Sequence, residues 1–381
     1  MKIKIQKNIS LKKFTTFKIG GLAEFYTVVK SEKEILEALD FAKINNLQIF
    51  ILGGGSNILI SDNGFSGLVI HNKIFGFKIQ KNISENFVTL QVGAGEKWDD
   101  VVKRAAENNL SGLECLSGIP GTAGAAAVQN IGAYGHSFSE IVYQIKVLEI
   151  KTKKIIYLNK PECHFDYRQS IFNTSASGNY IILEIFLKLK IINFKVKARK
   201  LNSNLKLKSD VLSVKYYDLQ TYFLNNPPKS LSEIRRAVLK IRADKGMVIL
   251  PGFKSYKSAG SFFKNPIVSV DNFEKIEKSL EHKINNLENL SKPWHWLTSN
   301  GQMKISAAFL MEQVGFQKGF KLGSAGISPS HALAFINLQD GTAKDIRRLA
   351  TRIQKKVFQK FGIILETEVQ LIGFKKRNFK K

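Results

Sequence analysis

The chain contains 381 residues, 44% of them hydrophobic, and carries a formal net charge of +27. This length and apolar share are enough for two or three packed domains and exclude a wholly disordered chain. The sequence has no apolar run of about 18 residues, and residues 1–17 contain no continuous apolar stretch, so we expect a cytoplasmic protein without membrane insertion.

The positive charge makes nucleic-acid binding a candidate function, because clustered lysines neutralise phosphates. The lysines are instead spread along the whole chain, so we expect no nucleic-acid partner and a field that attracts anionic small molecules. The densest basic stretches, 188–208 and 375–381, are expected to be solvated surface and a frayed tail. Cys115 and Cys163 lack metal-ligand spacing and are expected to be buried thiols.

Predicted helices and strands alternate in the first half of the chain. Ser31 and Glu34 form a capping box that begins a helix, and residues 48–52 and 58–60 are predicted strands on either side of the glycines at 53–55. Further expected elements are a strand at 87–92, a helix at 98–108, a hairpin of 142–150 with 154–158, and a strand at 180–189.

The second half contains two more capping boxes ahead of amphipathic stretches. They are Ser230 with Glu233, and Thr342 with Asp345. Gly362 is suited to end the second of these helices, and residues 363–372 form a predicted final strand. Residues 191–207 are lysine-rich with few turn signals, so we assign them no element. The loop-like composition of 246–257 predicts a domain boundary near residue 245.

Two glycine-rich loops are candidate cofactor-binding segments. Gly53-Gly54-Gly55-Ser56-Asn57 offers backbone N–H groups with no Cβ in the way, which suits a pyrophosphate, although it also suits a plain turn. It lacks the G-x-G-x-x-G spacing and leads into a strand, so a Rossmann site is disfavoured. Residues 119–135 combine many small residues with the amides of Gln129 and Asn130, which favours a flat cofactor ring over a tight crossover.

Ser261 and Arg168 are candidates for chemistry. Ser261 lies between Gly260 and two aromatic residues, where its hydroxyl could deliver a proton in a dry pocket or serve only as a turn or cap residue. Arg168 lies among the aromatics of 165–172, where a desolvated guanidinium requires either an anionic ligand or an ordinary ion pair.

Two carboxylates occur in the predicted final strand. The period of two in residues 365–373 places Leu365, Thr367, Val369 and Leu371 on one face and the polar residues on the other. Glu366 and Glu368 therefore share a face. The period does not choose between them, and both also suit an edge strand that faces solvent.

Together these motifs resemble those of the UDP-N-acetylenolpyruvoylglucosamine reductase (UDP-N-acetylmuramate dehydrogenase) family of flavoenzymes. The resemblance spans nearly the whole chain and is weakest at 191–207 and 272–290. It implies an α+β fold, with a two-lobed FAD-binding unit of the vanillyl-alcohol oxidase (PCMH) type and a C-terminal α+β substrate-binding domain. The implied domains are a first FAD-binding lobe at 1–65 completed by 341–381, a second lobe at 66–246, and a substrate-binding domain at 247–340.

The resemblance also implies a reaction, the NADPH-dependent reduction of UDP-N-acetylenolpyruvoylglucosamine to UDP-N-acetylmuramate in peptidoglycan precursor synthesis. NADPH would deliver hydride to FAD, and the reduced flavin would pass hydride to the terminal carbon of the enolpyruvyl ether. Arg168 would stabilise the enediolate-like charge together with a protonated Glu368, which the resemblance selects over Glu366. Ser261 would then protonate the neighbouring carbon.

The resemblance assigns ligand contacts to a larger set of residues. Those implied near FAD are Gly53, Gly54, Gly55, Ser56, Asn57, Gln129, Asn130 and Gly132. Those implied to hold the UDP group are Tyr216, Lys245, Asn265 and Lys304, with the lysines as point charges on the diphosphate. Trp296 and His331 depart from the family pattern, where tyrosine and glutamine are more usual. We expect no metal and a monomeric protein.

Two other functions fit part of the pattern. Another flavoprotein of the same cofactor fold, such as an alcohol oxidase, is disfavoured by the joint presence of Arg168, Ser261 and Glu368. A basic nucleic-acid-binding protein would carry no flavin and would show steeply salt-dependent DNA affinity.

Overall fold

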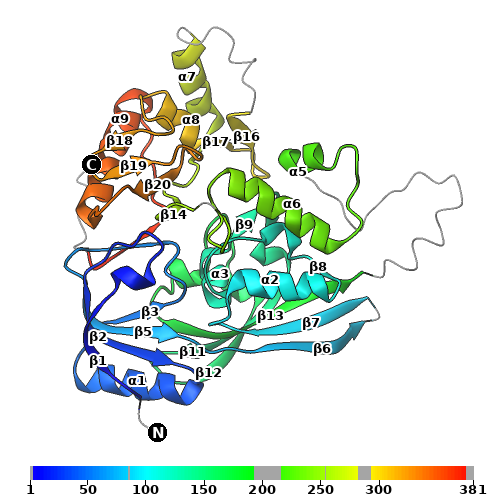
Figure 1. Ribbon diagram of the computed structural model, residues 1–381, viewed down its shortest axis with the longest axis vertical. Helices are drawn as coiled ribbons and strands as arrows, with labels where there is room; N and C mark the ends of the chain where they lie inside the picture. The colour runs from blue at the N-terminus through cyan, green and yellow to red at the C-terminus, as the bar shows by residue number, and fades with distance from the viewer. Residues whose placement is uncertain (1–2, 85, 193–215, 254, 282–292, 375–381) are drawn as a thin grey trace, which may run out of the picture. The chain divides into compact units, whose positions relative to one another are not determined.

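The structure is a computed structural model that describes residues 3–84, 86–192, 216–253, 255–281 and 293–374. The basic stretch from 193 to 208, most of the unassigned segment 191–207, and the tail 375–381 therefore lie outside the described residues. The chain divides into two compact units (Figure 1). Unit 1 comprises Met1–Ser10, Leu22–Gly55 and Phe65–Ser255, and unit 2 comprises Leu11–Gly21, Ser56–Gly64 and Tyr256–Lys381.

The first sheet of unit 1 has the strand order β1-β2-β5-β3. Its strands are β1 (Gln6–Ser10), β2 (Leu22–Val29), β3 (Ile49–Leu52) and β5 (Phe65–Asn72). Strands β2, β5 and β3 run parallel, whereas β1 is antiparallel to β2. Helix α1 (Glu32–Ile44) covers one face of this sheet, where Ile35 and Ala38 pack with Leu68 and Ile70 (Figure 1). Its start is confirmed, because the Ser31 hydroxyl accepts a hydrogen bond from the Glu34 amide at 3.2 Å.

The second sheet of unit 1 is antiparallel and has six strands, five of them in the order β12-β11-β13-β7-β6, with β8 also paired to β13. The strands are β6 (Phe77–Ser84), β7 (Phe87–Gly93), β8 (Leu110–Ser111), β11 (Val142–Glu149), β12 (Ile155–Asn159) and β13 (Tyr180–Ile191). Helices α2 (Trp98–Glu107) and α3 (Ala123–Gln129) pack their apolar residues on β7, β11 and β13. The predicted hairpin, the two predicted strands and the helix at 98–108 are all confirmed.

In the described part of unit 1, the remaining elements are short, apart from one long helix. The short strands β9 (Gly132–Ala133) and β10 (His136–Ser137) form a hairpin, and α5 (Tyr217–Tyr222) precedes α6 (Leu231–Asp244). The predicted N-cap of α6 is confirmed by the hydrogen bond from the Glu233 amide to Ser230 Oγ at 3.1 Å, whereas the Glu233 carboxylate accepts from the Lys229 amide at 2.6 Å and so does not complete the predicted capping box. Short 3₁₀ helices in the described ranges lie at Lys12–Phe14 in unit 2 and at Glu114–Leu116, Phe138–Glu140, Lys160–Cys163 and Ile171–Asn173 in unit 1.

Among its described residues, unit 2 contains three small sheets and three α-helices. One sheet has the order β14-β20-β19-β18, a second has the order β15-β17-β16, and β4 pairs with β21 in parallel. The strands are β4 (Ile58–Ile60), β14 (Ser258–Ser261), β15 (Ile267–Val268), β16 (His295–Leu297), β17 (Met303–Ile305), β18 (Lys321–Leu322), β19 (Ala325–Ile327), β20 (Ala334–Asn337) and β21 (Gln370–Ile372). The helices are α7 (Val270–Glu281), α8 (Ala307–Glu312) and α9 (Ala343–Phe361). Helix α9 begins at the predicted Thr342 cap and ends at Gly362, as expected.

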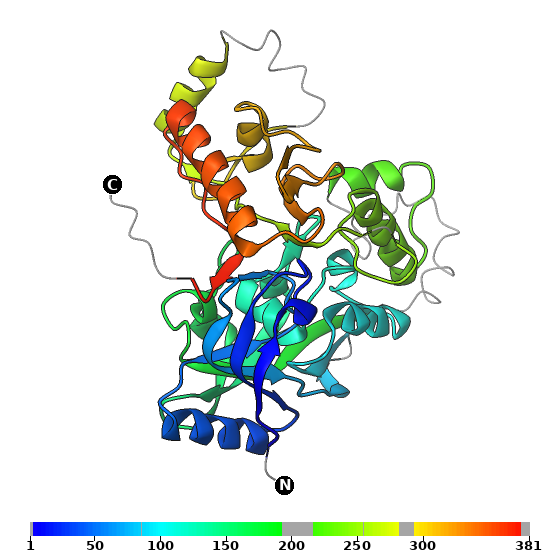
Figure 2. The same ribbon diagram turned by 60° about the vertical axis from the view of Figure 1, so that its left-hand side comes forward.

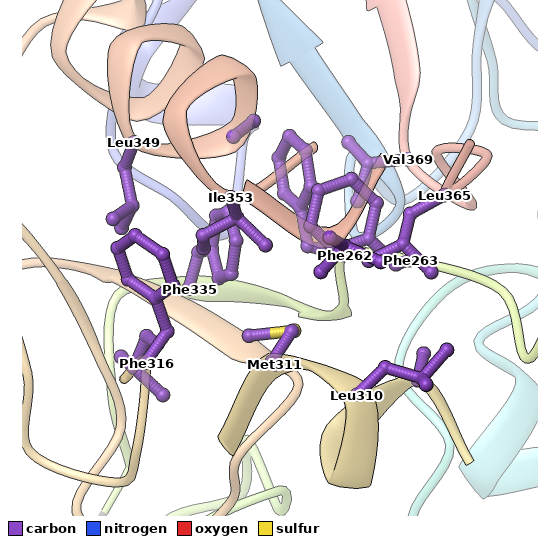
Figure 3. Close-up of a cluster of buried hydrophobic side chains, with 14 of the residues drawn as sticks. Phe262, Phe263, Leu310, Met311, Phe316, Phe335, Leu349, Ile353, Leu365 and Val369 are labelled. Atoms are coloured by element: carbon purple, nitrogen blue, oxygen red, sulfur yellow. The ribbon is translucent and has the colours of Figure 1, made fainter. Parts of the chain in front are cut away.

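Aromatic rings dominate the core of unit 2 (Figure 3). Phe262 stacks on Phe335 with ring centroids 4.4 Å apart, and Phe263 meets the same ring edge-on at 5.5 Å. Leu349 and Ile353 of α9 belong to the same cluster. The four-stranded sheet and α9 therefore share one tightly packed interior.

The predicted final strand at 363–372 is wrong for most of its length. Only Gln370–Ile372 form a strand, and Leu371 is 37% exposed while Leu365 and Val369 are buried. The reason is a change of partner within the segment. The Glu368 amide donates to the Phe262 carbonyl at 2.8 Å, whereas the Gln370 amide donates to the Asn57 carbonyl at 3.0 Å. A bend between the two partners breaks the period of two that the sequence shows.

The two cysteines are buried and free, as predicted. Burial raises the pKa of each thiol to about 12. Of the helices in the described ranges, none is long and apolar enough to cross a membrane. The predicted domain boundaries stay a prediction; the contacts place the described part of 341–381 in unit 2 and the sheet formed by β1, β2, β3 and β5 in unit 1.

Candidate active site

The glycine loop connects β3 to β4 and lies against the second small-residue segment. A Cβ added to Gly54 would lie 2.6 Å from the Cα of Gly121, which is closer than any side chain tolerates. One built on Gly53 would lie 2.8 Å from Thr122 Oγ1. The two loops that the sequence predicts to hold a cofactor are therefore in direct contact within unit 1, and glycine is required for their close approach.

The last residue of the glycine loop belongs to unit 2. Asn57 donates from Nδ2 to the Glu368 carbonyl at 3.2 Å, and its own carbonyl accepts from the Gln370 amide at 3.0 Å. Asn57 thus holds the segment that carries the predicted catalytic glutamate. Ser56, which precedes it, is half-buried.

The second segment forms a short helix followed by a tight hairpin. Thr122 caps α3, which has 7 residues, and Asn130 ends it in the left-handed conformation with φ 42°. Gln129 and Asn130 are both buried. The Asn130 side chain donates to the Asp166 carbonyl at 2.7 Å and accepts from the Ser139 amide at 3.0 Å. The Asn130 amide group therefore fixes neighbouring main chain.

Arg168 lies at the turn between Asp166 and Gln169, whose backbones exchange hydrogen bonds of 3.1 and 3.0 Å. Its backbone is left-handed, with φ 56°. The guanidinium donates to the Gly132 carbonyl at 2.7 Å and to the Asn130 carbonyl at 3.5 Å. These contacts place the Arg168 guanidinium on the main chain that follows α3, in the segment predicted to face FAD.

A polar cluster surrounds Tyr134, which the sequence analysis did not single out. Tyr134 occupies the hairpin turn with φ 53°, followed by Gly135 with φ 80°, as in a type I′ turn. Its buried ring meets the ring of Tyr216 edge-on at 5.3 Å. Lys245 places its ammonium 5.8 Å from the same ring and pairs with Asp218 at 2.6 Å. The structure therefore brings together Tyr216 and Lys245, two of the residues predicted to hold the UDP group.

Arg242 is a second residue that the sequence analysis missed. It lies one turn before Lys245 on α6, is only 7% exposed, and hydrogen-bonds to the Tyr134 side chain. Desolvation lowers the pKa of the Arg242 guanidinium, and Tyr134 and Asp99 oppose that shift. Burial raises the pKa of Tyr134 to about 12, so the phenol stays protonated.

Ser261 and Glu368 lie on hydrogen-bonded segments of unit 2. Ser261 ends β14, where it pairs with Ala334, and the Phe262 carbonyl that follows it accepts from the Glu368 amide at 2.8 Å. The side chains of Ser261 and Glu368 are both partly exposed. Because Phe262 is locked in the aromatic core, the backbone beside Ser261 is rigidly placed (Figure 3).

The two glutamates of the C-terminal segment have different surroundings. The Glu366 side chain is 73% exposed and lies 3.5 Å from the Lys264 ammonium. Glu368 is partly buried next to Phe262. The structure thus separates two carboxylates that the sequence period placed on the same face.

The remaining predicted UDP contacts lie on the three-stranded sheet of unit 2 and next to it. Lys304 is the central residue of β17, the middle strand. It pairs with Ile267 of β15 on one side and with Trp296 of β16 on the other. Trp296 is 43% exposed. Asn265 accepts a hydrogen bond from the Ala307 amide at 3.0 Å, at the start of α8. Directly paired residues share a face of a sheet, so the partly buried Lys304 and the exposed Trp296 form one polar and aromatic surface.

The predicted site residues thus form separate groups, and the members of each group lie in the same unit. Unit 1 holds Arg168 on the cofactor segment, and it also holds the pair of Tyr216 and Lys245. Unit 2 holds Ser261 with Glu368, and it also holds Lys304 with Trp296. The roles assigned to these residues stay predictions.

Comparisons with known proteins place this arrangement in a family. Residues 23–154 match the FAD binding domain model, and residues 253–372 match the model of the C-terminal domain of UDP-N-acetylenolpyruvoylglucosamine reductase. The reductase of Amoebophilus asiaticus (strain 5a2) is 37% identical over 370 residues, covering 97% of this chain and 99% of that protein. The reductase of Flavobacterium johnsoniae is 35% identical over 371 residues, covering 97% and 100%.

A solved structure agrees with the fold. The crystal structure of UDP-N-acetylenolpyruvylglucosamine reductase from Thermus caldophilus aligns with a TM-score of 0.60 at 24% identity, covering 97% of this chain and 99% of that one. The expected α+β fold with an FAD-binding unit and a C-terminal α+β domain is therefore confirmed. Given relatives that match along almost their entire length, the chain belongs to the UDP-N-acetylenolpyruvoylglucosamine reductase family of FAD-dependent oxidoreductases.

Proposed function

We propose that this chain reduces UDP-N-acetylenolpyruvoylglucosamine to UDP-N-acetylmuramate with NADPH, using Arg168, Ser261 and Glu368 as its catalytic residues. The observation that carries the proposal is the hydrogen bond between the segment that holds Ser261 and the segment that holds Glu368. Ser261 and Glu368 lie far apart in the sequence, and this backbone hydrogen bond joins the segment of a candidate proton donor to the segment of a candidate carboxyl group. A reduction that needs both a proton and stabilisation of negative charge would use such a pair.

The glycine-rich segments of unit 1 fit FAD. Gly54 and Gly121 carry no side chain where the two loops meet, and diphosphates bind to backbone of this kind. Gly53, Gly54, Gly55, Ser56 and Asn57 would hold the diphosphate, and Gln129, Asn130 and Gly132 would lie beside the flavin. When bound, FAD accepts hydride from NADPH and returns hydride to the substrate.

Arg168 would bind the carboxylate of the enolpyruvyl group. A guanidinium is planar and presents several N–H donors, so it can donate to the Gly132 carbonyl and still offer N–H groups to a carboxylate. The left-handed turn fixes the direction from which the side chain leaves the backbone. As hydride reaches the terminal carbon, negative charge grows on this carboxylate, and the interaction with Arg168 strengthens.

Ser261 would donate the proton that completes the reduction. Addition of hydride to the terminal carbon converts the C=C bond into a carbanionic centre at the neighbouring carbon, and the Ser261 hydroxyl supplies the proton to that centre. The serine then regains a proton from water. Glu368 in its protonated form would donate a hydrogen bond to the substrate carboxylate and share the developing charge with Arg168.

The clusters around Tyr134 and Lys304 would hold the UDP group. Lys245 and Lys304 carry point charges suited to a diphosphate, and Tyr216 offers a partly exposed phenol next to Lys245. Asn265 would contribute its amide. The proposal includes a cytoplasmic location, because the substrate and NADPH are both anionic cytoplasmic metabolites that the net charge of +27 attracts. It also includes a monomeric state.

The test is NADPH consumption by the FAD-loaded protein with and without the enolpyruvyl substrate. We expect fast consumption with UDP-N-acetylenolpyruvoylglucosamine and formation of UDP-N-acetylmuramate, identified by mass. UDP-N-acetylglucosamine lacks the enolpyruvyl group and serves as the matched control, with no product expected. Consumption of NADPH that depends on oxygen alone, with no reduced sugar nucleotide, would contradict the proposal.

A further inference from the structure

A buried histidine lies directly behind the glycine loop. His71 is the penultimate residue of β5, the central strand between β2 and β3, and is only 7% exposed. Its register partner on β3 is Leu52, and Gly53 follows Leu52 in the chain. The end of β5 thus brings the imidazole next to the first residue of the loop.

The imidazole has polar contacts on two sides. Tyr26 Oη lies 2.7 Å from His71 Nδ1, and the ring also forms a hydrogen bond with the backbone of Gly53. The bond to Gly53 favours the protonated imidazole, as a bond donated by a ring N–H to a carbonyl does. Burial and the charge of Lys73 nevertheless lower the pKa of His71 to about 4, so the ring is neutral at physiological pH. With its one N–H directed to Gly53, the neutral ring accepts from the Tyr26 hydroxyl.

The orientation of one peptide group follows from this contact. The C=O and N–H of a trans peptide point in opposite directions. When the Gly53 carbonyl is held towards His71, the Gly54 N–H in the same peptide group points away from the imidazole. Gly54 has no side chain to cover this donor, and its contact with Gly121 leaves no room for one.

We propose that His71 is a positioning residue for the flavin diphosphate, which it serves by holding the Gly53 carbonyl so that the Gly54 N–H is presented to the anion. Tyr26 supports it by fixing which ring nitrogen carries the proton. The inference rests on the proposed placement of FAD on residues 53–57. A purely structural pair in the sheet would affect stability and leave flavin affinity unchanged, so the two roles differ in a measurable quantity.

The experiment compares three variants with the wild-type protein. His71→Phe keeps a ring and removes the donor, His71→Gln keeps an N–H donor, and Tyr26→Phe keeps the imidazole and removes its hydroxyl partner. Thr27→Val is the matched control. Thr27 follows Tyr26 on β2, and its buried hydroxyl donates to the Lys4 carbonyl at 3.1 Å and not to the glycine loop. For each protein the FAD dissociation constant, the unfolding midpoint of the FAD-free form and the amide exchange of residues 53–57 are measured.

We expect His71→Phe to weaken FAD binding about tenfold or more, which corresponds to the loss of one hydrogen bond of about 1.4 kcal/mol. His71→Gln should recover part of the FAD affinity. Thr27→Val should lower the unfolding midpoint and leave the FAD affinity unchanged. If His71→Phe does not fold, Tyr26→Phe provides the test, with affinity reduced severalfold. Wild-type affinity in His71→Phe, or in Tyr26→Phe where His71→Phe does not fold, would overturn the inference.

Amide exchange separates this inference from the placement on which it rests. If FAD protects the amides of residues 53–57 in the wild-type protein, the loop is the binding site, and an unchanged affinity in His71→Phe overturns the role of His71 alone. If FAD gives these amides no protection, the placement itself fails and the inference fails with it. Faster exchange of the Gly54 amide in FAD-free His71→Phe than in Thr27→Val is the result expected.

Discussion

The candidate catalytic arginine of unit 1 is held by polar contacts with main-chain carbonyls, whereas the candidate proton donor of unit 2 is held by packed aromatic rings. Arg168 depends on the carbonyls of Asn130 and Gly132 and on a left-handed backbone. Ser261 precedes Phe262, whose ring stacks on Phe335. Hydrogen bonds give direction, and packing gives rigidity. We therefore expect substitutions at Arg168 to change turnover through the geometry and charge of the side chain. Near Ser261, we expect loss of the hydroxyl to affect turnover and loss of packing to affect stability.

The largest effect is expected for Ser261→Ala. Loss of a positioned acid should slow reoxidation of the reduced flavin by substrate about 10²–10⁴-fold, while reduction by NADPH stays near normal. Stopped-flow measurement of both half-reactions provides the check. Ser258→Ala is the matched control on the same strand, where the buried Ser258 Oγ accepts from the Gly260 amide at 3.2 Å. It should cost stability and spare both half-reactions; a Ser261 variant impaired only in reduction by NADPH would refute the assignment.

Arg168→Lys is expected to have the next largest effect, on the polar side of the comparison. Lysine keeps the charge and loses the planar group that can donate to Gly132 and to a carboxylate together. A displacement of about 1 Å in a catalytic group can cost about 10²-fold, and we expect a loss in kcat of that order, with flavin content unchanged. Steady-state kinetics and the flavin-to-protein ratio provide the measurement. Turnover like that of the wild-type protein would show that charge alone suffices.

Burial of His71 should also make the stability of unit 1 depend on pH. Folding lowers the pKa of His71 from 6.5 to about 4, mainly by desolvation and also through Lys73. Between these values the unfolded chain binds a proton that the folded chain does not. The stabilisation is therefore complete above pH 6.5 and is lost as the pH falls towards 4, with a loss of about 2 kcal/mol at pH 5.

Denaturant unfolding at about pH 7.5 and about pH 5, which lie above and below the free histidine pKa of about 6.5, tests this dependence in the FAD-free protein. The wild-type protein should lose more stability on acidification than His71→Phe. An equal loss in both proteins would mean that His71 does not carry the effect. Phe335→Leu in unit 2 replaces one apolar side chain by another, so it should lower the unfolding free energy by a similar amount at both pH values.

Local signals in the sequence were sufficient for much of the fold. The N-caps at Ser31, Ser230 and Thr342 begin α1, α6 and α9 as predicted, because a cap depends on residues only a few positions away. The segment 363–372 could not be predicted in this way. Its conformation is set by two partners, at Phe262 and Asn57, which are remote in the sequence.

The candidate site shows the same division between local and long-range information. The motifs supplied the candidate residues, but the hydrogen bonds of Asn130, the contact of Arg242 with Tyr134 and the position of His71 depend on which segments meet in space. Arg242 did have a sequence signal. It continues the apolar face of α6 formed by Leu231, Ile234 and Val238, where a charged residue is unexpected and indicates a buried partner.

The smallest effect is expected for Glu366→Gln, which sharpens the choice between the two glutamates. Its carboxylate is exposed, and its ion pair with Lys264 spans 3.5 Å, so solvent screening limits its contribution to stability to about 0–1 kcal/mol. Turnover should stay within about twofold of wild type, as for other surface substitutions. Glu368→Gln is the matched variant two residues away, and it removes the acid that would share the developing charge, so it should slow the substrate half-reaction and leave flavin reduction intact. Both variants are measured in the same stopped-flow assay. Equal losses of rate in the two variants would refute the assignment of Glu368 as the catalytic carboxyl group, because its burial beside Phe262 would then not distinguish it from the exposed Glu366.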